Sequence, residues 1–325
     1  MKTKVLVTGG SGFLGYKFIE SLKKYGEKID FIINLRNEDV DVFKNERHIL
    51  IYNDIVNNFH FSGKIDILFH IASETRDKDK MWSTNYGGTI NVMKWAIKAG
   101  VKKVVYVSSI AVFGKNNRKI ISGSSQCLPE STYGKSKLRA EKFVTEICTK
   151  NKVQYFILRP SNIIDIDNIH SCHLLQFIKS INMGHFFYFK NPEKVYLNYI
   201  TVDNVINCME SLIKLESKKK LYLLNTPTNL KNVVQVVANT LGVKNPKRII
   251  PYNIGKQCGI LCDLLQNISN IKIPFNSSRF QEITNERQYI GDFPKSNLIS
   301  VDSLDFIITM KQLTSKYQLN KRIKK

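Results

Sequence analysis

Short apolar runs alternate with longer amphipathic segments along the first half of the chain. The runs have strand length and are rich in Val and Ile, as expected for strands buried on both faces of a sheet. They lie at residues 4–8, 30–35, 48–52, 65–71, 103–108 and 155–159. The longer segments carry apolar residues three and four positions apart, which predicts helices. They lie at residues 13–25, 89–99 and 135–150.

This alternation predicts an α/β fold, a Rossmann-type doubly wound parallel sheet with a smaller C-terminal lobe. The pattern is clear through about residue 165 and loosens beyond it. We therefore assign residues 1–165 to the Rossmann domain, expect residues 195–225 to return to it, and assign residues 166–325 mainly to the lobe. A strand is expected at residues 221–224, followed by a turn at residues 225–228 and a helix at residues 230–241. Residues 258–268 are apolar at helical spacing, which fits a helix in the core or one that lines a substrate pocket.

A glycine-rich turn follows the first predicted strand and precedes the first predicted helix. Its sequence, Gly9-Gly10-Ser11-Gly12-Phe13-Leu14-Gly15, fits a dinucleotide fingerprint with either Gly9 or Gly10 as the first glycine. Glycine is needed there because a Cβ would block the approach of the backbone to a pyrophosphate. The helix N-terminus offers free N–H groups to the anion. We predict that Gly9, Gly12, Phe13, Leu14 and Gly15 bind a dinucleotide, and that the C-terminal lobe binds the substrate.

The end of the second predicted strand bears on which dinucleotide binds. An NAD site usually places Asp or Glu there, but this chain has Arg36. A guanidinium suits the 2′-phosphate of NADP. Alternatively Arg36 is a surface residue and Glu38 or Asp39 serves the ribose, so NADP and NAD both remain open. Asp54, after the third strand, fits either the adenine side of the site or an ordinary turn.

Tyr133 and Lys137 stand four positions apart, and on a helix they share one face. A nearby ammonium favours the phenolate, so Tyr133 can move a proton to or from a substrate oxygen near neutral pH. Upstream, the strand at residues 103–108 ends in Ser108-Ser109. Strand ends of this kind face the ligand crevice of an open parallel sheet. A serine hydroxyl there can hold the oxygen that Tyr133 protonates.

These motifs together resemble one known family, the extended short-chain dehydrogenase/reductases or NAD-dependent epimerase/dehydratase family, best known for nucleotide-sugar enzymes. The resemblance is carried by Thr8-Gly9-Gly10-Ser11-Gly12-Phe13-Leu14-Gly15, Ser108-Ser109-Ile110-Ala111-Val112-Phe113-Gly114 and Tyr133-Gly134-Lys135-Ser136-Lys137. Four further segments are similar to other motifs of the family, the last of them to a late strand with a Val-Asp pair. They lie at residues 68–73, 85–89, 158–162 and 199–205.

The resemblance implies a role for each matching residue. Tyr133 would be the catalytic acid and base, and Lys137 would lower its pKa and hold the nicotinamide ribose. Ser109, with Ser108 as the less favoured neighbour, would hold the substrate oxygen. Asn162 would lie where cofactor and substrate meet. The other implied cofactor contacts are Asp54, Ile55, Ala72, Asn85 and Pro160.

Departures from the family pattern narrow the reaction. Family dehydratases carry Asp-Glu where this chain has Ile110-Ala111, which argues against dehydration. Many family epimerases clamp the substrate diphosphate with an Arg where this chain has Leu197. A 4-keto reductase or a 4-epimerase of a nucleotide-activated sugar fits best. The alternatives are an NADPH-dependent reductase of a small or steroid-like carbonyl compound and a non-catalytic protein that senses NAD(P).

Composition and charge mainly argue against certain partners, namely nucleic acid, a membrane and a metal ion. Lys and Arg number 49 against 27 Asp and Glu, a net charge of +22, but they are dispersed and no nucleic-acid module is present, so we expect no specific nucleic-acid partner. No apolar run is long enough to span a membrane and no secretory signal is present, so we expect a cytoplasmic protein without a membrane partner.

The six cysteines lack zinc spacing, so we expect buried thiols and no metal. By resemblance, the helices at residues 89–99 and 135–150 would form a homodimer interface.

Overall fold

A seven-stranded parallel sheet forms the centre of the computed structural model, which describes residues 2–36, 48–57, 59–167, 173–269, 275–294 and 304–323. The strand order is β10-β7-β5-β4-β1-β2-β3, so the chain reverses its direction of winding next to β1. The strands are β1 (Thr3–Thr8), β2 (Ile29–Leu35), β3 (Ile49–Tyr52), β4 (Ile67–His70), β5 (Lys103–Val107), β7 (Gln154–Pro160) and β10 (Leu221–Leu224). This order confirms the predicted Rossmann-type fold and places a ligand crevice at the carboxyl ends of the strands.

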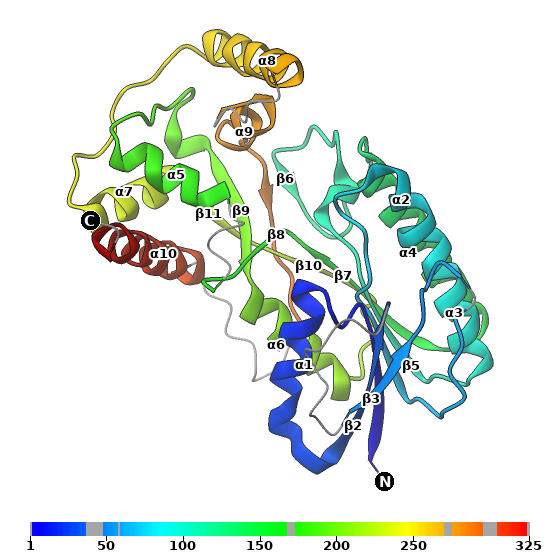
Figure 1. Cartoon of the computed structure of the whole chain (residues 1–325). Helices are drawn as coiled ribbons and strands as arrows, with labels where there is room; N and C mark the ends of the chain where they lie inside the picture. Colours follow the sequence, from blue (N-terminus) through cyan, green and yellow to red (C-terminus); the bar gives the residue numbers. More distant parts are fainter. Residues whose placement is uncertain are drawn as a thin grey trace.

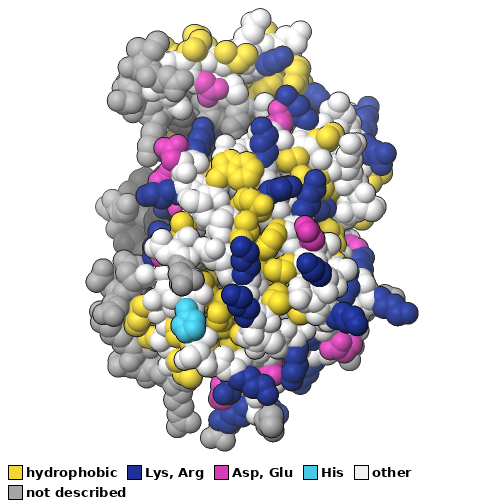
Figure 2. Space-filling model, turned by 90° about the vertical axis from the view of Figure 1, so that its right-hand side faces the viewer, with side chains coloured by type: hydrophobic (Ala, Val, Ile, Leu, Met, Phe, Trp, Pro, Cys, Tyr) yellow, Lys and Arg dark blue, Asp and Glu magenta, His cyan; other side chains and the backbone are white. Residues whose placement is uncertain are grey.

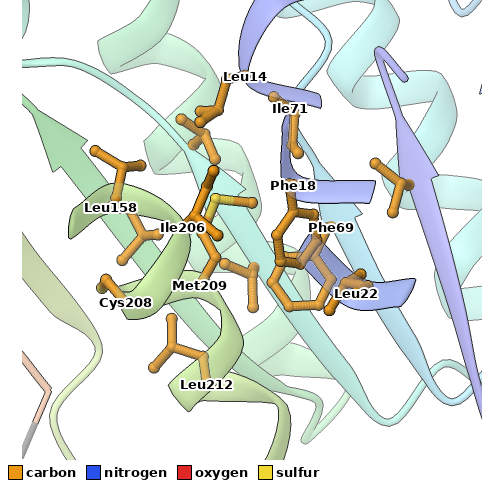
Figure 3. Packing of buried hydrophobic residues seen from close by; sticks show 14 of the residues in the cluster. Leu14, Phe18, Leu22, Phe69, Ile71, Leu158, Ile206, Cys208, Met209 and Leu212 are labelled. Carbon is orange, nitrogen blue, oxygen red and sulfur yellow. The ribbon is translucent and has the colours of Figure 1, made fainter. Parts of the chain in front are cut away.

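One face of the sheet is covered by α1 (Phe13–Leu22) and α6 (Val202–Lys214), which lie side by side (Figure 1). Phe18 of α1 packs on Phe69 of β4 with ring centroids 4.6 Å apart. Met209 and Leu212 of α6 complete the same buried cluster (Figure 3). Burial of apolar surface contributes about 25 cal/mol of folding free energy per Å². This packing holds α6 on the Rossmann sheet, although the strand that precedes α6 belongs to the lobe.

The opposite face is covered by α3 (Thr89–Lys98) and α4 (Thr132–Lys150). Val92 of α3 and Val144 of α4 pack there against Leu68 and Tyr106 of the sheet. Before α3, the chain forms α2 (Lys78–Trp82) and the short helix η3 (Ser83–Gly88). Figure 2 views the molecule from the side that carries α2, α3 and α4, where Lys and Arg side chains border hydrophobic ones.

The C-terminal lobe is built on a three-stranded sheet, in the order β11-β9-β8, and on the helices around it (Figure 1). Its strands are β8 (Asn162–Ile164), β9 (Tyr196–Thr201) and β11 (Thr226–Asn229). Its helices are α5 (His173–Asn182), η6 (Pro192–Lys194), α7 (Leu230–Leu241), α8 (Tyr252–Ser269), α9 (Ser277–Glu282) and α10 (Leu304–Ile323). A small pair, β6 (Ile120–Ile121) and β12 (Gln288–Tyr289), joins the lobe to the loops above the main sheet. The remaining short helices are η1 (Lys23–Lys28) and η4 (Ile110–Phe113).

Two expectations for the second half are wrong. Residues 225–228 were expected to be a turn, but most of them belong to β11, where Pro227 is tolerated because β11 is an edge strand that pairs only with β9. The strand expected at residues 199–205 ends at Thr201. The Thr201 hydroxyl caps α6 by accepting the amide of Asn204 at 3.3 Å, which makes Val202 the first helical residue.

The exposure of the cysteines also differs from expectation. Cys148 and Cys208 are buried as predicted, but Cys258 is exposed on α8, so the expectation of a buried thiol is wrong there. Cys172 lies outside the described residues. Among the helices that the structure describes, none combines the length and the apolarity needed to cross a bilayer.

Candidate active site

The glycine turn after β1 is closely packed. Gly9 has a φ of +75°, and a Cβ there would lie 2.7 Å from the backbone of Ala72. A Cβ on Gly15 would lie 2.1 Å from the carbonyl oxygen of Gly9. Gly12 begins α1 and supplies no side-chain cap, so the first amides of this helix are available to an anion.

The start of α4 is pressed against η4, and this contact positions Tyr133. Ser131 caps α4 by accepting the amide of Gly134 at 3.0 Å. A Cβ on Gly134 would lie 2.4 Å from the carbonyl oxygen of Ala111 in η4, so only glycine permits this approach. Tyr133 therefore meets Ser109, which precedes η4 and accepts the amide of Ala111 at 3.1 Å.

The hydroxyls of Ser73 and Ser109 lie close to the hydroxyl of Tyr133. Burial raises the pKa of Tyr133, and the two serine hydroxyls oppose that rise. The lowering expected from the sequence is therefore not observed, because desolvation outweighs the polar contacts. In this structure the phenol is neutral at neutral pH.

Lys137 lies one helical turn beyond Tyr133 and is only 1% exposed. Its Nζ donates to the carbonyl oxygen of Val107 at 2.6 Å and lies 4.5 Å from the ring centroid of Tyr106. Burial lowers the pKa of Lys137 to about 7, and the carboxylate of Glu141 opposes the shift. The amine is thus held at the carboxyl end of β5. Its contact with a ribose stays a prediction.

Asn85 organises the loop that follows β4. Its Oδ1 accepts from the Ser73 hydroxyl at 3.1 Å and from the amide of Glu74 at 2.7 Å. Its Nδ2 donates to the Glu74 carbonyl at 3.0 Å and to the Ser136 hydroxyl at 3.1 Å. The amide group expected to touch the cofactor therefore ties Ser73 to α4. Sequence reasoning missed Ser73, although it follows a predicted strand as Ser109 does.

His70 is fully buried behind these loops. Its Nδ1 lies 2.7 Å from the hydroxyl of Thr8, and its Nε2 lies 2.9 Å from the hydroxyl of Thr89. Burial, assisted by the charge of Lys137, lowers the pKa of His70 to about 3. The imidazole is therefore neutral in the folded protein throughout the physiological range.

We expect acidification to destabilise the protein through His70. The unfolded chain protonates this histidine below about pH 6.5, whereas the folded protein does so only near pH 3. The unfolded state therefore binds more protons between these values, and stability falls as pH decreases through this window. The expected loss is about 2 kcal/mol between pH 7 and pH 5. Urea unfolding of the parent and of His70→Gln at both pH values tests this. The variant should lose about 2 kcal/mol less, and equal losses would contradict the assignment.

The other predicted cofactor residues lie along the same edge of the sheet. Arg36 follows β2 and is exposed. Asp54 follows β3 and closes a turn by accepting a backbone amide at 3.0 Å, while the Ile55 side chain is buried beside α3. Pro160 ends β7 and is buried. Residues 38–39, the alternative ribose ligands, lie outside the described residues.

A cleft of about 1350 Å³ lies between this edge and the lobe. Phe13, Ser109 and Tyr133 line it from the Rossmann side, and Asn162 from β8. Six basic and four acidic side chains also line the cleft. They are Arg76, Lys115, Arg118, Lys119, Lys190 and Arg287, with Glu130, Asp165, Glu282 and Glu286.

Arg287 is a cleft residue that sequence reasoning missed. Its Nη1 donates to the carbonyl oxygen of Gly114 at 2.8 Å, across 173 residues of sequence. Leu197, which occupies the place of the expected diphosphate clamp, is buried in the core of the lobe. A guanidinium therefore reaches the cleft from a segment in which no local pattern indicated one.

The residues at the sheet edge fit a bound dinucleotide. The glycine turn has no room for a Cβ at Gly9 or Gly15, as expected where a backbone must approach a pyrophosphate. Ser108 and Ser161 follow β5 and β7, and their buried hydroxyls make no hydrogen bond within the described residues. Such orphaned groups suit the polar edge of a cofactor. Within the same residues, no group of three His, Cys, Asp or Glu side chains is arranged to hold a metal ion.

Comparison with known proteins gives sequence relatives of two kinds. The N-acetyl-alpha-D-glucosaminyl-diphospho-ditrans,octacis-undecaprenol 4-epimerase of Escherichia coli O157:H7 is 27% identical over 301 residues, which cover 89% of this chain and 88% of that protein. The dTDP-D-glucose 4,6-dehydratase of Mus musculus is 32% identical over 180 residues, 49% of this chain and 50% of that protein. The chain thus spans about half the length of the second relative.

Solved structures share the fold. The UDP-glucose 4-epimerase with UDP-glucose from Thermotoga maritima superposes with a TM-score of 0.68 at 18% identity, over 98% of this chain and 100% of that one. The Bordetella bronchiseptica enzyme WbmG in complex with NAD and UDP gives 0.66 at 18% identity, over 98% and 96%. A family model described as the NAD dependent epimerase/dehydratase family matches residues 5–224. This match covers most of the chain, and residues of several motifs line one cleft. The chain therefore belongs to the NAD-dependent epimerase/dehydratase family.

Proposed function

We propose that the chain is an NAD(P)-dependent 4-epimerase of a sugar carried on a diphosphate. The observation that carries this proposal is the meeting of the Tyr133, Ser109 and Ser73 side chains beside a cleft of about 1350 Å³. Ile110 and Ala111 line the same cleft without a carboxylate, which argues against dehydration. A 4-epimerase is also among the relatives and matches 89% of the chain, which favours epimerisation over the 4-keto reduction that the sequence left open.

In this proposal Tyr133 moves the proton and the serines fix the oxygen. With the sugar 4-hydroxyl beside Ser109, Tyr133 acts as the phenolate, the form that the positive charge of an oxidised nicotinamide would favour in the loaded site. The phenolate accepts the hydroxyl proton as the carbon is oxidised and returns it as the carbon is reduced. A bound nicotinamide supplies the hydride chemistry at that carbon. Gly134 keeps Tyr133 close to Ser109, and Asn85 keeps Ser73 in place. The cleft must let the oxidised sugar turn over before it is reduced on its other face.

The charges of the cleft support an anionic substrate. Lys115 pairs with Glu130 at 2.5 Å, and Lys190 pairs with Glu286 at 3.1 Å. Arg287 is anchored to a backbone carbonyl and makes no ion pair within the described residues. A guanidinium held in this way suits a diphosphate, because it presents several donors in a fixed plane. We propose that Arg287 binds the substrate diphosphate. In many family epimerases an Arg at the position of Leu197 has this role, which the leucine side chain cannot fill.

The experiment that tests this function is a product analysis. UDP-glucose, UDP-N-acetylglucosamine and dTDP-glucose are incubated with the purified protein and its bound cofactor, and proton NMR reports the configuration at C4. We expect an equilibrium mixture of 4-epimers. A 4-keto-6-deoxy product would indicate a dehydratase, and stoichiometric consumption of NADPH with a keto-sugar or a small carbonyl compound would indicate a reductase. Dinucleotide binding without turnover of any sugar would indicate a sensor.

Arg36 provides a test of the cofactor. Its exposed guanidinium at the end of β2 is expected to favour the 2′-phosphate, so Arg36→Ala should weaken NADP binding about tenfold and NAD binding much less. Fluorescence titration with NADPH and NADH measures both constants. Lys98→Ala removes one positive charge from α3 and is the control. Equal losses for the two dinucleotides would contradict the role of Arg36 and favour NAD.

The face formed by α3 and α4 provides a test of self-association. Phe143 and Ile147 of α4 are only partly buried, and Trp82 of α2 is 44% exposed. We propose that this face forms a homodimer interface. Phe143→Asp should then shift the mass measured by analytical ultracentrifugation from dimer to monomer, and a parent that already sediments as a monomer would contradict the proposal.

A further inference from the structure

Helix α8 presents an apolar face to solvent at the outer end of the lobe (Figure 1). The side chains of Ile254, Ile260, Leu261 and Leu264 are 51%, 47%, 57% and 54% exposed. Spacings of three, four and seven positions place them along one side of the helix. Among the described residues, six of the 18 exposed large hydrophobic side chains belong to this one helix. Exposed apolar side chains gathered in this way mark an interaction surface.

The opposite side of α8 faces the protein. A Cβ on Gly255 would lie 2.3 Å from the ring of Phe189, and a Cβ on Gly259 would lie 3.2 Å from the backbone of Ser277. The two glycines thus let α8 pack closely on α9. Tyr252 at the start of α8 lines the substrate cleft, as does Gln281 of α9. Helix α8 therefore reaches the cleft at its first residue.

Basic residues border the apolar face. Lys244, Lys247 and Arg248 are exposed just before α8, and Lys256 is exposed on it. Between residues 242 and 266, Asp263 is the single carboxylate in the sequence, and it accepts the amide of Ser277 at 3.3 Å. The whole chain carries a net charge of +22. This charge repels a second copy of the same surface and attracts an anionic one.

We propose that α8 docks the protein on an anionic lipid bilayer. An apolar helix face bordered by cations is the pattern of a helix that lies in the headgroup region. The docking rests on the exposed side chains of α8 and on the basic residues beside them, and it does not depend on the proposed function. The proposal replaces the sequence-based expectation of no membrane partner.

Co-sedimentation with vesicles tests the docking. The full chain is mixed with phosphatidylcholine vesicles that contain about one third phosphatidylglycerol, and with pure phosphatidylcholine vesicles. We expect binding to the anionic vesicles, and a loss of at least about tenfold in affinity for Leu261→Ser/Leu264→Ser, which leaves the charge unchanged. The matched control is Ile308→Ser/Leu319→Ser on α10, where the replaced side chains are 51% and 56% exposed. Thermal unfolding followed by circular dichroism confirms that both variants fold.

Three results would overturn the docking proposal. They are a parent that does not bind anionic vesicles, equal binding by the parent and the α8 variant, and a parent dimer that the α8 substitutions convert to monomer. The last result would show that a second copy covers the face. Epimerisation of a UDP-sugar without vesicles separates the two proposals. If the docking proposal is wrong, the parent and the α8 variant still epimerise the UDP-sugar. If the proposed function is wrong, the parent does not epimerise the UDP-sugar but still binds anionic vesicles.

Discussion

Replacing Tyr133 with Phe is expected to lower turnover by about 10²- to 10⁴-fold, the contribution typical of a positioned acid and base. The change removes one hydroxyl, whose neighbours are the hydroxyls of Ser73 and Ser109. The ring still fills its place at the start of α4, so dinucleotide affinity and the midpoint of urea unfolding should change little. Steady-state kinetics with the UDP-sugar that is epimerised fastest, together with fluorescence titration of the cofactor, separates the two effects.

The control for this variant removes the same atom elsewhere. Tyr25→Phe deletes a hydroxyl that donates to Glu210 at 3.0 Å, beside α6 and away from the residues that line the cleft. Its turnover should match that of the parent. A Tyr133→Phe protein that keeps its turnover within about tenfold of the parent would contradict the assignment of Tyr133 as the proton carrier.

The second large effect is expected from the buried ion pair beneath α4. Nε and Nη2 of Arg159 donate to the two carboxylate oxygens of Glu141 at 3.0 and 2.7 Å, and the side chains are 7% and 4% exposed. Arg159→Met would leave the Glu141 charge buried without its partner, which costs about 3–5 kcal/mol. Glu141 lies one turn beyond Lys137, so the loss reaches the helix that carries Tyr133. Urea unfolding measures it.

A double-mutant cycle tests whether the two side chains act as a unit. Arg159→Met combined with Glu141→Leu removes both charges and should be less destabilised than Arg159→Met alone. Glu193→Gln, which breaks an exposed pair with Lys231 at 2.7 Å, should lower the stability far less than Arg159→Met and serves as the control. Simple additivity of the two single changes would contradict a coupled buried pair.

The Rossmann half was predictable because its strands are buried on both faces. Val5, Leu6 and Val7 of β1 are all inaccessible to solvent, so the strand is a continuous apolar run in the sequence. The glycine turn is equally local, since the close contacts of Gly9 and Gly15 arise where one strand meets one helix. Tyr133 and Ser109 were found because each belongs to a short motif at the end of a regular element.

The lobe and part of the site depend on contacts between distant segments. Residues 226–229 form an edge strand only because β9 pairs with them, and no local pattern reports that pairing. The apolar residues of α8 were expected in the core or along a substrate pocket, yet many of them face solvent, because the glycine side of the helix is the side that packs. Arg287 reaches the cleft across 173 residues. Such positions follow from tertiary packing rather than from periodicity.

The central claim is that the carbon at position 4 of the sugar is oxidised and then reduced within one binding event. The most direct test uses the UDP-sugar epimerised fastest in the product analysis, labelled with deuterium at C4, in the presence of excess unlabelled NADH and NADPH. The account predicts a 4-epimer that retains deuterium at C4 and no net oxidation of the added dinucleotides. A 4-epimer that carries hydrogen at C4, with the deuterium recovered in the pool of added dinucleotide, would contradict it.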